Sequence, residues 1–153
     1  MRAMRLHEWG EPEQLRLDEL PDPEPGPGQV SVRVRAAGCN FPDILLCQGK
    51  YQVKPPLPFS PGVEIAGEVL ALGEGVDGVD VGDRVLGDLA MGGYASHVTV
   101  DSGRVYRIPD AMPFEEAAAF PIVYQTSYFA LVHRAPVQPG QTLLVHGAAG
   151  GVG

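Results

Sequence analysis

The stretch Gln29–Gly38, QVSVRVRAAG, decides the fold of this chain. Apolar side chains recur at every second position, with serine and arginine between them. Side chains of a β-strand point alternately to opposite faces, so the pattern predicts a strand with one buried and one exposed face. The face expected to be buried carries Val30, Val32, Val34 and Ala36, and the exposed face carries Ser31, Arg33 and Arg35.

Further short strands are expected on both sides of this stretch. The 20 glycines and 15 prolines are scattered, which indicates many turns rather than a low-complexity region. Strand-like patterns occur at residues 1–7, 15–19, 64–72, 94–100 and 104–108, and residues 81–85 are expected to form a tight turn into a strand. The proline-rich segments 21–29 and 54–62 are expected to be loops, because proline cannot donate a hydrogen bond to a sheet. Residues 1–109 therefore predict a mostly β fold, a compact barrel or sandwich.

A short helix is expected just after the first strand. Asn40 is a favourable N-cap residue, and Pro42 and Asp43 suit the first turn of a helix. The apolar residues that follow continue the helix, and Gly49 is expected to end it.

The chain changes character after residue 109. Residues 114–134 have Glu115 and Glu116 near the start and His133 and Arg134 at the end, as a helix does, and Pro121 is expected to split or kink this helix. The β-branched and leucine-rich run Thr142–His146 predicts a strand, followed by a glycine loop. This order of helix, turn, strand and glycine loop is typical of the opening of an α/β unit.

Composition narrows the range of partners. The net charge is −8 and there is no basic patch, so we expect no nucleic-acid partner. Cys39 and Cys47 are spaced neither as a metal-binding nor as a redox pair, and two cysteines make a poor disulfide framework. No stretch approaches the roughly 18 uninterrupted apolar residues of a membrane span. We therefore expect a cytoplasmic protein with free thiols and no membrane partner.

The final loop, Ala148–Gly153, nearly matches the dinucleotide-binding pattern GxGxxG, with Ala148 in place of the first glycine. Small residues there allow a tight turn and let backbone N–H groups approach a pyrophosphate. The alternative is an ordinary flexible glycine tail. Within these 153 residues the preceding strand lacks a covering helix and sheet neighbours, so we also expect this segment to be poorly ordered.

Six motifs occur together in the order of one known family. They are AAGCNFPDILLCQGKY (36–51), PPLPFSPGVEIAGEVLALGEGV (55–76), VGDRV (81–85), GGYASHV (92–98), FEEAAAFPIVYQTSYFAL (114–131) and HGAAGGVG (146–153). With these motifs the chain resembles the medium-chain dehydrogenase/reductase superfamily, and more narrowly the zinc-independent quinone oxidoreductases of the zeta-crystallin type. The resemblance implies a GroES-like β-barrel catalytic domain over residues 1–120 and the start of a truncated NAD(P)-binding Rossmann domain over residues 121–153.

Zinc is not expected. In zinc-binding relatives a cysteine and a histidine hold the catalytic metal, and the corresponding positions here are Asn40 and Val63. Cys39 is one residue early, and no cysteine occurs where relatives carry a four-cysteine structural zinc lobe. A catalytic zinc needs three protein ligands, and two of the usual ones are replaced.

The resemblance implies an NAD(P)H-dependent reductase of quinones or activated enones. NADPH is the expected cofactor, with NADH not excluded, and a homodimer is expected for the longer protein. Asn40 and Tyr51 are the implied catalytic residues. The implied cofactor contacts are Asn40, Thr126, Ala149, Gly150, Gly151, Val152 and Gly153.

Alternatives stay open at this stage. Asn40 could serve only as a helix cap, Tyr51 only as a packing residue, and Thr126 only as a helix-face hydroxyl bonded to the backbone. Leu45 stands where relatives often have a tyrosine, which suggests a more apolar cleft. For the whole protein, the alternatives are an enoyl-thioester (acyl-CoA) reductase and a non-catalytic binding module.

Overall fold

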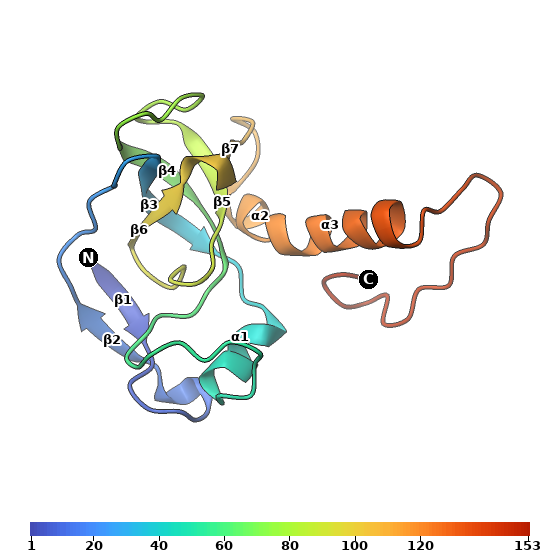
Figure 1. Ribbon diagram of the computed structural model, residues 1–153, viewed down its shortest axis with the longest axis horizontal. Coiled ribbons are helices and arrows are strands. Elements are labelled where there is room, and N and C mark those ends of the chain that lie inside the picture. Colours follow the sequence, from blue (N-terminus) through green and yellow to red (C-terminus); the bar gives the residue numbers. More distant parts are fainter.

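The computed structural model describes residues 1–153 and contains one five-stranded antiparallel sheet, shown in Figure 1. The strand order is β6-β3-β4-β5-β7, so β4 is the central strand. A separate two-stranded sheet pairs β1 with β2. The strands span Arg2–Arg5 (β1), Arg16–Glu19 (β2), Gln29–Ala37 (β3), Glu64–Leu72 (β4), Arg84–Asp88 (β5), His97–Asp101 (β6) and Val105–Arg107 (β7). The mostly β prediction is confirmed, including the strand at Gln29–Gly38.

The main core lies inside the curve of the five-stranded sheet and consists almost entirely of valine. Its buried members are Val30, Val32, Ile65, Val69, Val79, Val85, Val98, Val100 and Val105. Both edge strands contribute to it, and only the 3-10 turn Ser102–Arg104 joins β6 to β7. The sheet therefore curls until its two edges meet at this corner.

The predicted barrel is nevertheless not closed. β6 pairs only with β3, and β7 pairs only with β5. Because β7 is only three residues long and its pairing is directed toward β5, no ladder joins the two edges. The barrel prediction was wrong in this respect, and the architecture is an open, strongly curved sheet.

The helices confirm the short helix expected after the first strand and the break expected at Pro121. α1 spans Phe41–Cys47 and ends before Gly49, whose φ of 64° favours glycine. The second helical region is broken into α2 (Phe114–Ala118) and α3 (Pro121–Tyr128), as expected from Pro121, and continues as a π-helical segment, Phe129–Arg134. None of these helices is long and apolar enough to cross a bilayer.

α2 packs against the sheet, and Arg84 at the start of β5 holds the segment that leads into it. The Arg84 guanidinium donates to the carbonyl oxygens of Pro109 at 3.0 Å and Met112 at 2.6 Å. It also lies 4.4 Å from the ring centre of Phe114. α3 therefore begins at a fixed place beside the sheet.

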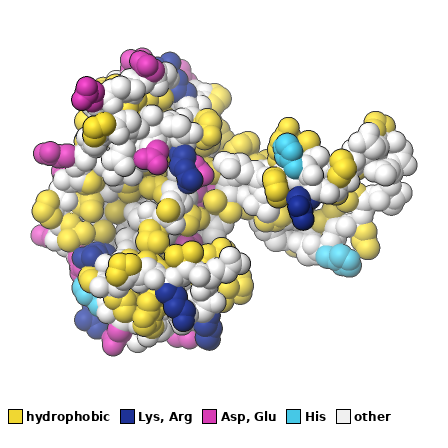
Figure 2. Space-filling model, viewed as in Figure 1, with side chains coloured by type: hydrophobic (Ala, Val, Ile, Leu, Met, Phe, Trp, Pro, Cys, Tyr) yellow, Lys and Arg dark blue, Asp and Glu magenta, His cyan; other side chains and the backbone are white.

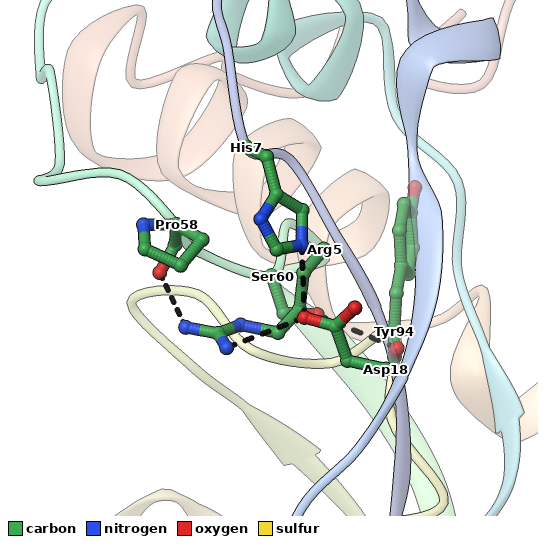
Figure 3. A network of polar contacts seen from close by, with 6 residues as sticks. All are labelled: Arg5, His7, Asp18, Pro58, Ser60 and Tyr94. Atoms are coloured by element: carbon green, nitrogen blue, oxygen red, sulfur yellow. Dashed lines mark hydrogen bonds and ion pairs between the residues drawn. The ribbon is translucent and has the colours of Figure 1, made fainter.

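A second apolar cluster joins the two-stranded sheet to α1. Leu6, Leu46, Cys47 and Phe59 are buried together. Figure 3 shows the polar contacts on this side: Asp18 of β2 accepts from Arg5 at 3.4 Å and pairs with His7 at 2.9 Å. Arg5 also donates to the Pro58 carbonyl oxygen at 2.6 Å. These contacts fix the loop that leads from Pro58 toward β4.

We expect Cys39, and not Cys47, to react with iodoacetamide in the folded chain. Cys39 is exposed, whereas Cys47 is only 1% exposed. Burial, followed by the charge of Asp43, raises the pKa of the Cys47 thiol and so lowers its content of the reactive thiolate. Mass spectrometry of alkylated peptides, with a denatured sample as control, measures this. Equal labelling of both thiols in the folded chain would contradict the expectation.

The strand predicted at Thr142–His146 does not form. Residues 135–153 extend from the end of the helical region, are exposed, and pair with no strand (Figure 1). A strand needs a neighbour for its backbone hydrogen bonds, and no sheet edge of this chain lies beside the segment. The prediction of a strand was therefore wrong for this chain.

Candidate functional site

Asn40 lies where β3 ends and α1 begins, and two carboxylates hold it. Its backbone N–H donates to Asp43 Oδ2 at 2.8 Å, which is the capping contact expected of an acid in the first turn. Its side-chain Nδ2 donates to Glu64 Oε1, also at 2.8 Å. The register of β3 with β4 pairs Ala37 with Ile65, which brings the residues after β3 to the start of β4. Asn40 itself is half-buried.

Glu64 is the most buried acid of the site, with a relative exposure of 2%. Its second oxygen, Oε2, accepts from the backbone N–H of Ile122 in the first turn of α3, at 2.8 Å. A side chain at Gly38 would overlap the Glu64 carboxylate, so this glycine leaves the space that the carboxylate fills. The site therefore connects β3, β4 and α3 through one carboxylate.

Asp43 is the second buried acid, 5% exposed, and it accepts three hydrogen bonds. The donors are the N–H of Asn40 at 2.8 Å, the N–H of Gly62 at 3.2 Å and the hydroxyl of Tyr94 at 2.8 Å. A carboxylate with three donors is well compensated for its burial. Asp43 thus fixes the start of α1 to the loop before β4.

The Tyr94 hydroxyl remains protonated over the physiological range. Burial is the main cause that raises the pKa of Tyr94 well above its usual range, and contacts with Cys39 and Asp43 add to it. The phenol is therefore a constant donor to Asp43 and is a poor general base.

We expect the free energy of unfolding to fall above pH ~10, and Tyr94→Phe to remove part of that fall. Because the pKa of Tyr94 is raised in the folded chain, the folded chain keeps a proton that the unfolded chain loses. Stability from this group is complete below the unfolded pKa and is lost progressively as the pH rises above it. Urea unfolding of both proteins near neutrality and at high pH measures this, and an equal loss in both would contradict it.

The structure does not bring the other two predicted side chains into contact with Asn40. Tyr51 follows α1 and packs, half-buried, against the cluster around Leu46 and Phe59, without a side-chain hydrogen bond. Thr126 lies on an exposed part of α3. Their roles toward substrate and cofactor stay predictions.

Two residues of the site were missed from the sequence. Glu64 was given no role, although a carboxylate at the start of an apolar strand is a signal of a buried polar contact. Tyr94 carried no comparable signal, because its contact with Asp43 joins residues 51 positions apart.

The glycine loop lies against α3. The Ser127 hydroxyl is within hydrogen-bond distance of the Val123 and Val152 carbonyl oxygens, at 2.8 and 3.2 Å. A Cβ on Gly151 would lie only 3.1 Å from Val123 Cγ1. The Gly150 N–H donates to Gly147 at 2.8 Å and closes the turn.

This loop fits an anionic ligand in two respects. The backbone N–H groups of Gly151, Val152 and Gly153 make no hydrogen bond and are exposed. Residues 121–153 contain no aspartate or glutamate, and on the face shown in Figure 2 no carboxylate lies over α3 or the segment after it. Free backbone donors without neighbouring carboxylates are what a pyrophosphate requires.

A metal site is not evident among the side chains. No group of three or more histidine, cysteine, aspartate or glutamate residues lies close enough together to hold an ion. The expectation that the protein works without zinc depends on Asn40 and Val63 and stays a prediction.

Comparisons with known proteins agree on one family. The model of the alcohol dehydrogenase GroES-like domain matches residues 26–110. A quinone oxidoreductase-like protein 2 homolog of Nematostella vectensis is 45% identical over 153 residues, which are 99% of this chain and 42% of the relative. The crystal structure of human synaptic vesicle membrane protein VAT-1 homolog-like protein is 42% identical, with a TM-score of 0.97 over 99% of this chain and 49% of that one. Escherichia coli quinone oxidoreductase complexed with NADPH is 33% identical, with a TM-score of 0.81 over 86% of this chain and 40% of that one.

The chain spans less than half the length of each of these relatives. Within that span, the family model covers more than half of the chain, and the structural agreement extends over 99% of it. The chain belongs to the medium-chain dehydrogenase/reductase superfamily and, within it, to the family of quinone oxidoreductases and VAT-1 proteins.

Proposed function

We propose that the full-length gene product is an NADPH-dependent oxidoreductase that transfers hydride to a quinone or to the activated C=C bond of an enone, without zinc. One observation carries the proposal. The half-buried amide of Asn40 stands at the position of a zinc ligand in metal-dependent relatives, and a buried carboxylate holds it in one orientation.

The amide suits the chemistry of these acceptors. When hydride reaches a quinone or an enone, negative charge develops on the carbonyl oxygen of the acceptor. An amide nitrogen has two hydrogens, and Asn40 uses one of them for Glu64. The other can donate to the acceptor oxygen and stabilise that charge, without cost of reorientation.

The cofactor assignment depends on the glycine loop and on a relative. Reduced nicotinamide, when bound, supplies the hydride. In this chain Gly151, Val152 and Gly153 offer free backbone donors for its phosphates, with Ala149 and Gly150 shaping the turn and Thr126 on the adjacent helix. The E. coli relative was crystallised with NADPH, which favours NADPH here.

Three further features belong to the same proposal. The nucleotide-binding part is a Rossmann domain that begins near residue 121, the active form is a homodimer, and the protein acts in the cytoplasm. Valine at position 63, whose side chain cannot bind a metal, favours an enzyme that polarises its acceptor by hydrogen bonding.

The test is turnover by the full-length gene product. NADPH and NADH oxidation is followed with benzoquinones, with simple enones and with an enoyl-CoA, each in the presence of a chelator. Faster turnover of quinones or simple enones supports the proposal, and preference for the thioester reassigns the protein as an enoyl-thioester reductase. If the protein neither turns over any acceptor nor binds a dinucleotide, the proposal is wrong and the protein is a non-catalytic binding module.

A further inference from the structure

The structure assigns Glu64 the role of a positioning residue, and we propose that it couples the Asn40 amide to α3, the helix beside the glycine loop. This inference rests on the proposed function, because it concerns how the amide that faces the acceptor is held. Glu64 touches neither substrate nor cofactor in this proposal and acts through Asn40.

The orientation of the Asn40 amide follows from what Glu64 can accept. Glu64 Oε1 lies 2.8 Å from Asn40 Nδ2, and a carboxylate oxygen accepts a hydrogen bond but does not donate one. The amide nitrogen must therefore face Glu64, and the amide oxygen must face away from it. Asp43 fixes the backbone of the same residue at 2.8 Å, so Asn40 is held at both its main chain and its side chain.

The same carboxylate completes the start of α3. Phe120, which precedes the helix, has no side-chain oxygen to cap it, and Pro121 has no N–H. The Ile122 N–H is the first donor at this helix end, and Glu64 Oε2 accepts from it at 2.8 Å. A carboxylate at this end also complements the helix dipole.

α3 in turn contacts the glycine loop, through Ser127 near Val152 and Val123 near Gly151. A chain of direct contacts therefore runs from the loop through α3 and Glu64 to Asn40. Contact alone shows only proximity, so the coupling needs a measurement of energy.

Glu64→Gln is the variant that separates the two bonds. Glutamine has one acceptor oxygen and one NH2 group, so one of its two partners meets a donor instead of an acceptor. Either the Asn40 amide turns, or the Ile122 N–H loses its partner. Glu68→Gln is the matched control: Glu68 lies four residues further along β4 and pairs only with the exposed side chains of Arg33 and Arg35.

The test is a double-mutant cycle on the full-length gene product, with Asn40→Ala as the second change. We expect Glu64→Gln to lower kcat for the best acceptor by about 10- to 100-fold, as for a misplaced catalytic group. In the Asn40→Ala background the same change is expected to cost less than about twofold, because the group it positions is gone. Glu68→Gln is expected to leave kcat within about twofold of wild type in both backgrounds.

Equal losses in the two backgrounds would show that Glu64 has only a structural role, and an unchanged kcat in Glu64→Gln would also overturn the proposal. If Glu64→Gln does not fold, Glu64→Asp replaces it in the cycle, because aspartate keeps both acceptor oxygens but is one methylene shorter.

A second readout does not depend on turnover. The side-chain NH2 resonances of Asn40, measured by NMR on the full-length gene product, are expected to shift in Glu64→Gln and to stay in place in Glu68→Gln. Unshifted resonances would overturn the positioning role whatever the activity. Shifted resonances in a protein without turnover would reject the proposed reductase function but support the hydrogen bond between Asn40 and Glu64. Failure of the positioning role and failure of the proposed function are therefore distinguishable.

Discussion

Asn40→Ala is expected to lower kcat of the full-length gene product with quinones by about 10²- to 10³-fold, the loss typical of one oxyanion donor. The half-buried amide is preorganised by Glu64 at 2.8 Å, so its free N–H needs no rearrangement when charge develops on the acceptor. The KM for NADPH is expected to change little, because the proposed phosphate contacts are in the glycine loop and not at Asn40. Steady-state kinetics with varied acceptor and varied NADPH measure both quantities.

Gln48→Ala is the matched control for this change. Gln48 lies at the opposite end of α1 and donates only to the exposed Glu11 at 2.8 Å. We expect kcat in this variant to remain within about twofold of wild type. If Asn40→Ala also kept kcat within a few-fold and lost only stability, Asn40 would be a helix cap, and the proposed polarising role would be wrong.

Local patterns were sufficient to predict most elements of this fold. The alternation over Gln29–Gly38 gave β3, and Pro121 marked the break between α2 and α3. These features depend on side-chain alternation and on the missing N–H of proline, which act within a few residues. Even in β3 the alternation was incomplete: Ser31, expected to be exposed, is buried, beside a register shift in the pairing with β4.

Features that depend on distant partners could not be predicted. Whether β6 and β7 close a barrel is decided by how the whole sheet curls, and whether Thr142–His146 forms a strand is decided by the presence of a neighbouring strand. In the candidate site, too, local features could be predicted and contacts between distant residues could not. Asn40 could be found from its local motif, but the bond from Glu64 to Ile122 spans 58 positions and has no local signature.

Gly67→Ala is expected to destabilise the chain by about 3 kcal/mol, at the upper end of the usual cost of overpacking. Gly67 is buried in the central strand β4, opposite Val34 of β3 and Val85 of β5. A Cβ there would overlap the carbonyl oxygen of Arg33 and lie 2.9 Å from Val32 Cγ1. The obstructing atom is backbone, and β3 is paired on both sides by β4 and β6, so it cannot move away without breaking a ladder.

Gly87→Ala is the control, because Gly87 is also buried in this sheet, in the adjacent strand β5. A Cβ at Gly87 would meet only ordinary contacts, the nearest being Ile65 Cδ1 at 3.5 Å. We expect a change within about 1 kcal/mol, since alanine also lowers the entropy of the unfolded chain. Urea unfolding of the wild type and the two variants measures both effects, provided that the dependence of the unfolding free energy on urea concentration is the same in all three. If both variants lost the same stability, the specific clash at Gly67 would not be the cause. The sheet would then tolerate an added β-carbon at neither position.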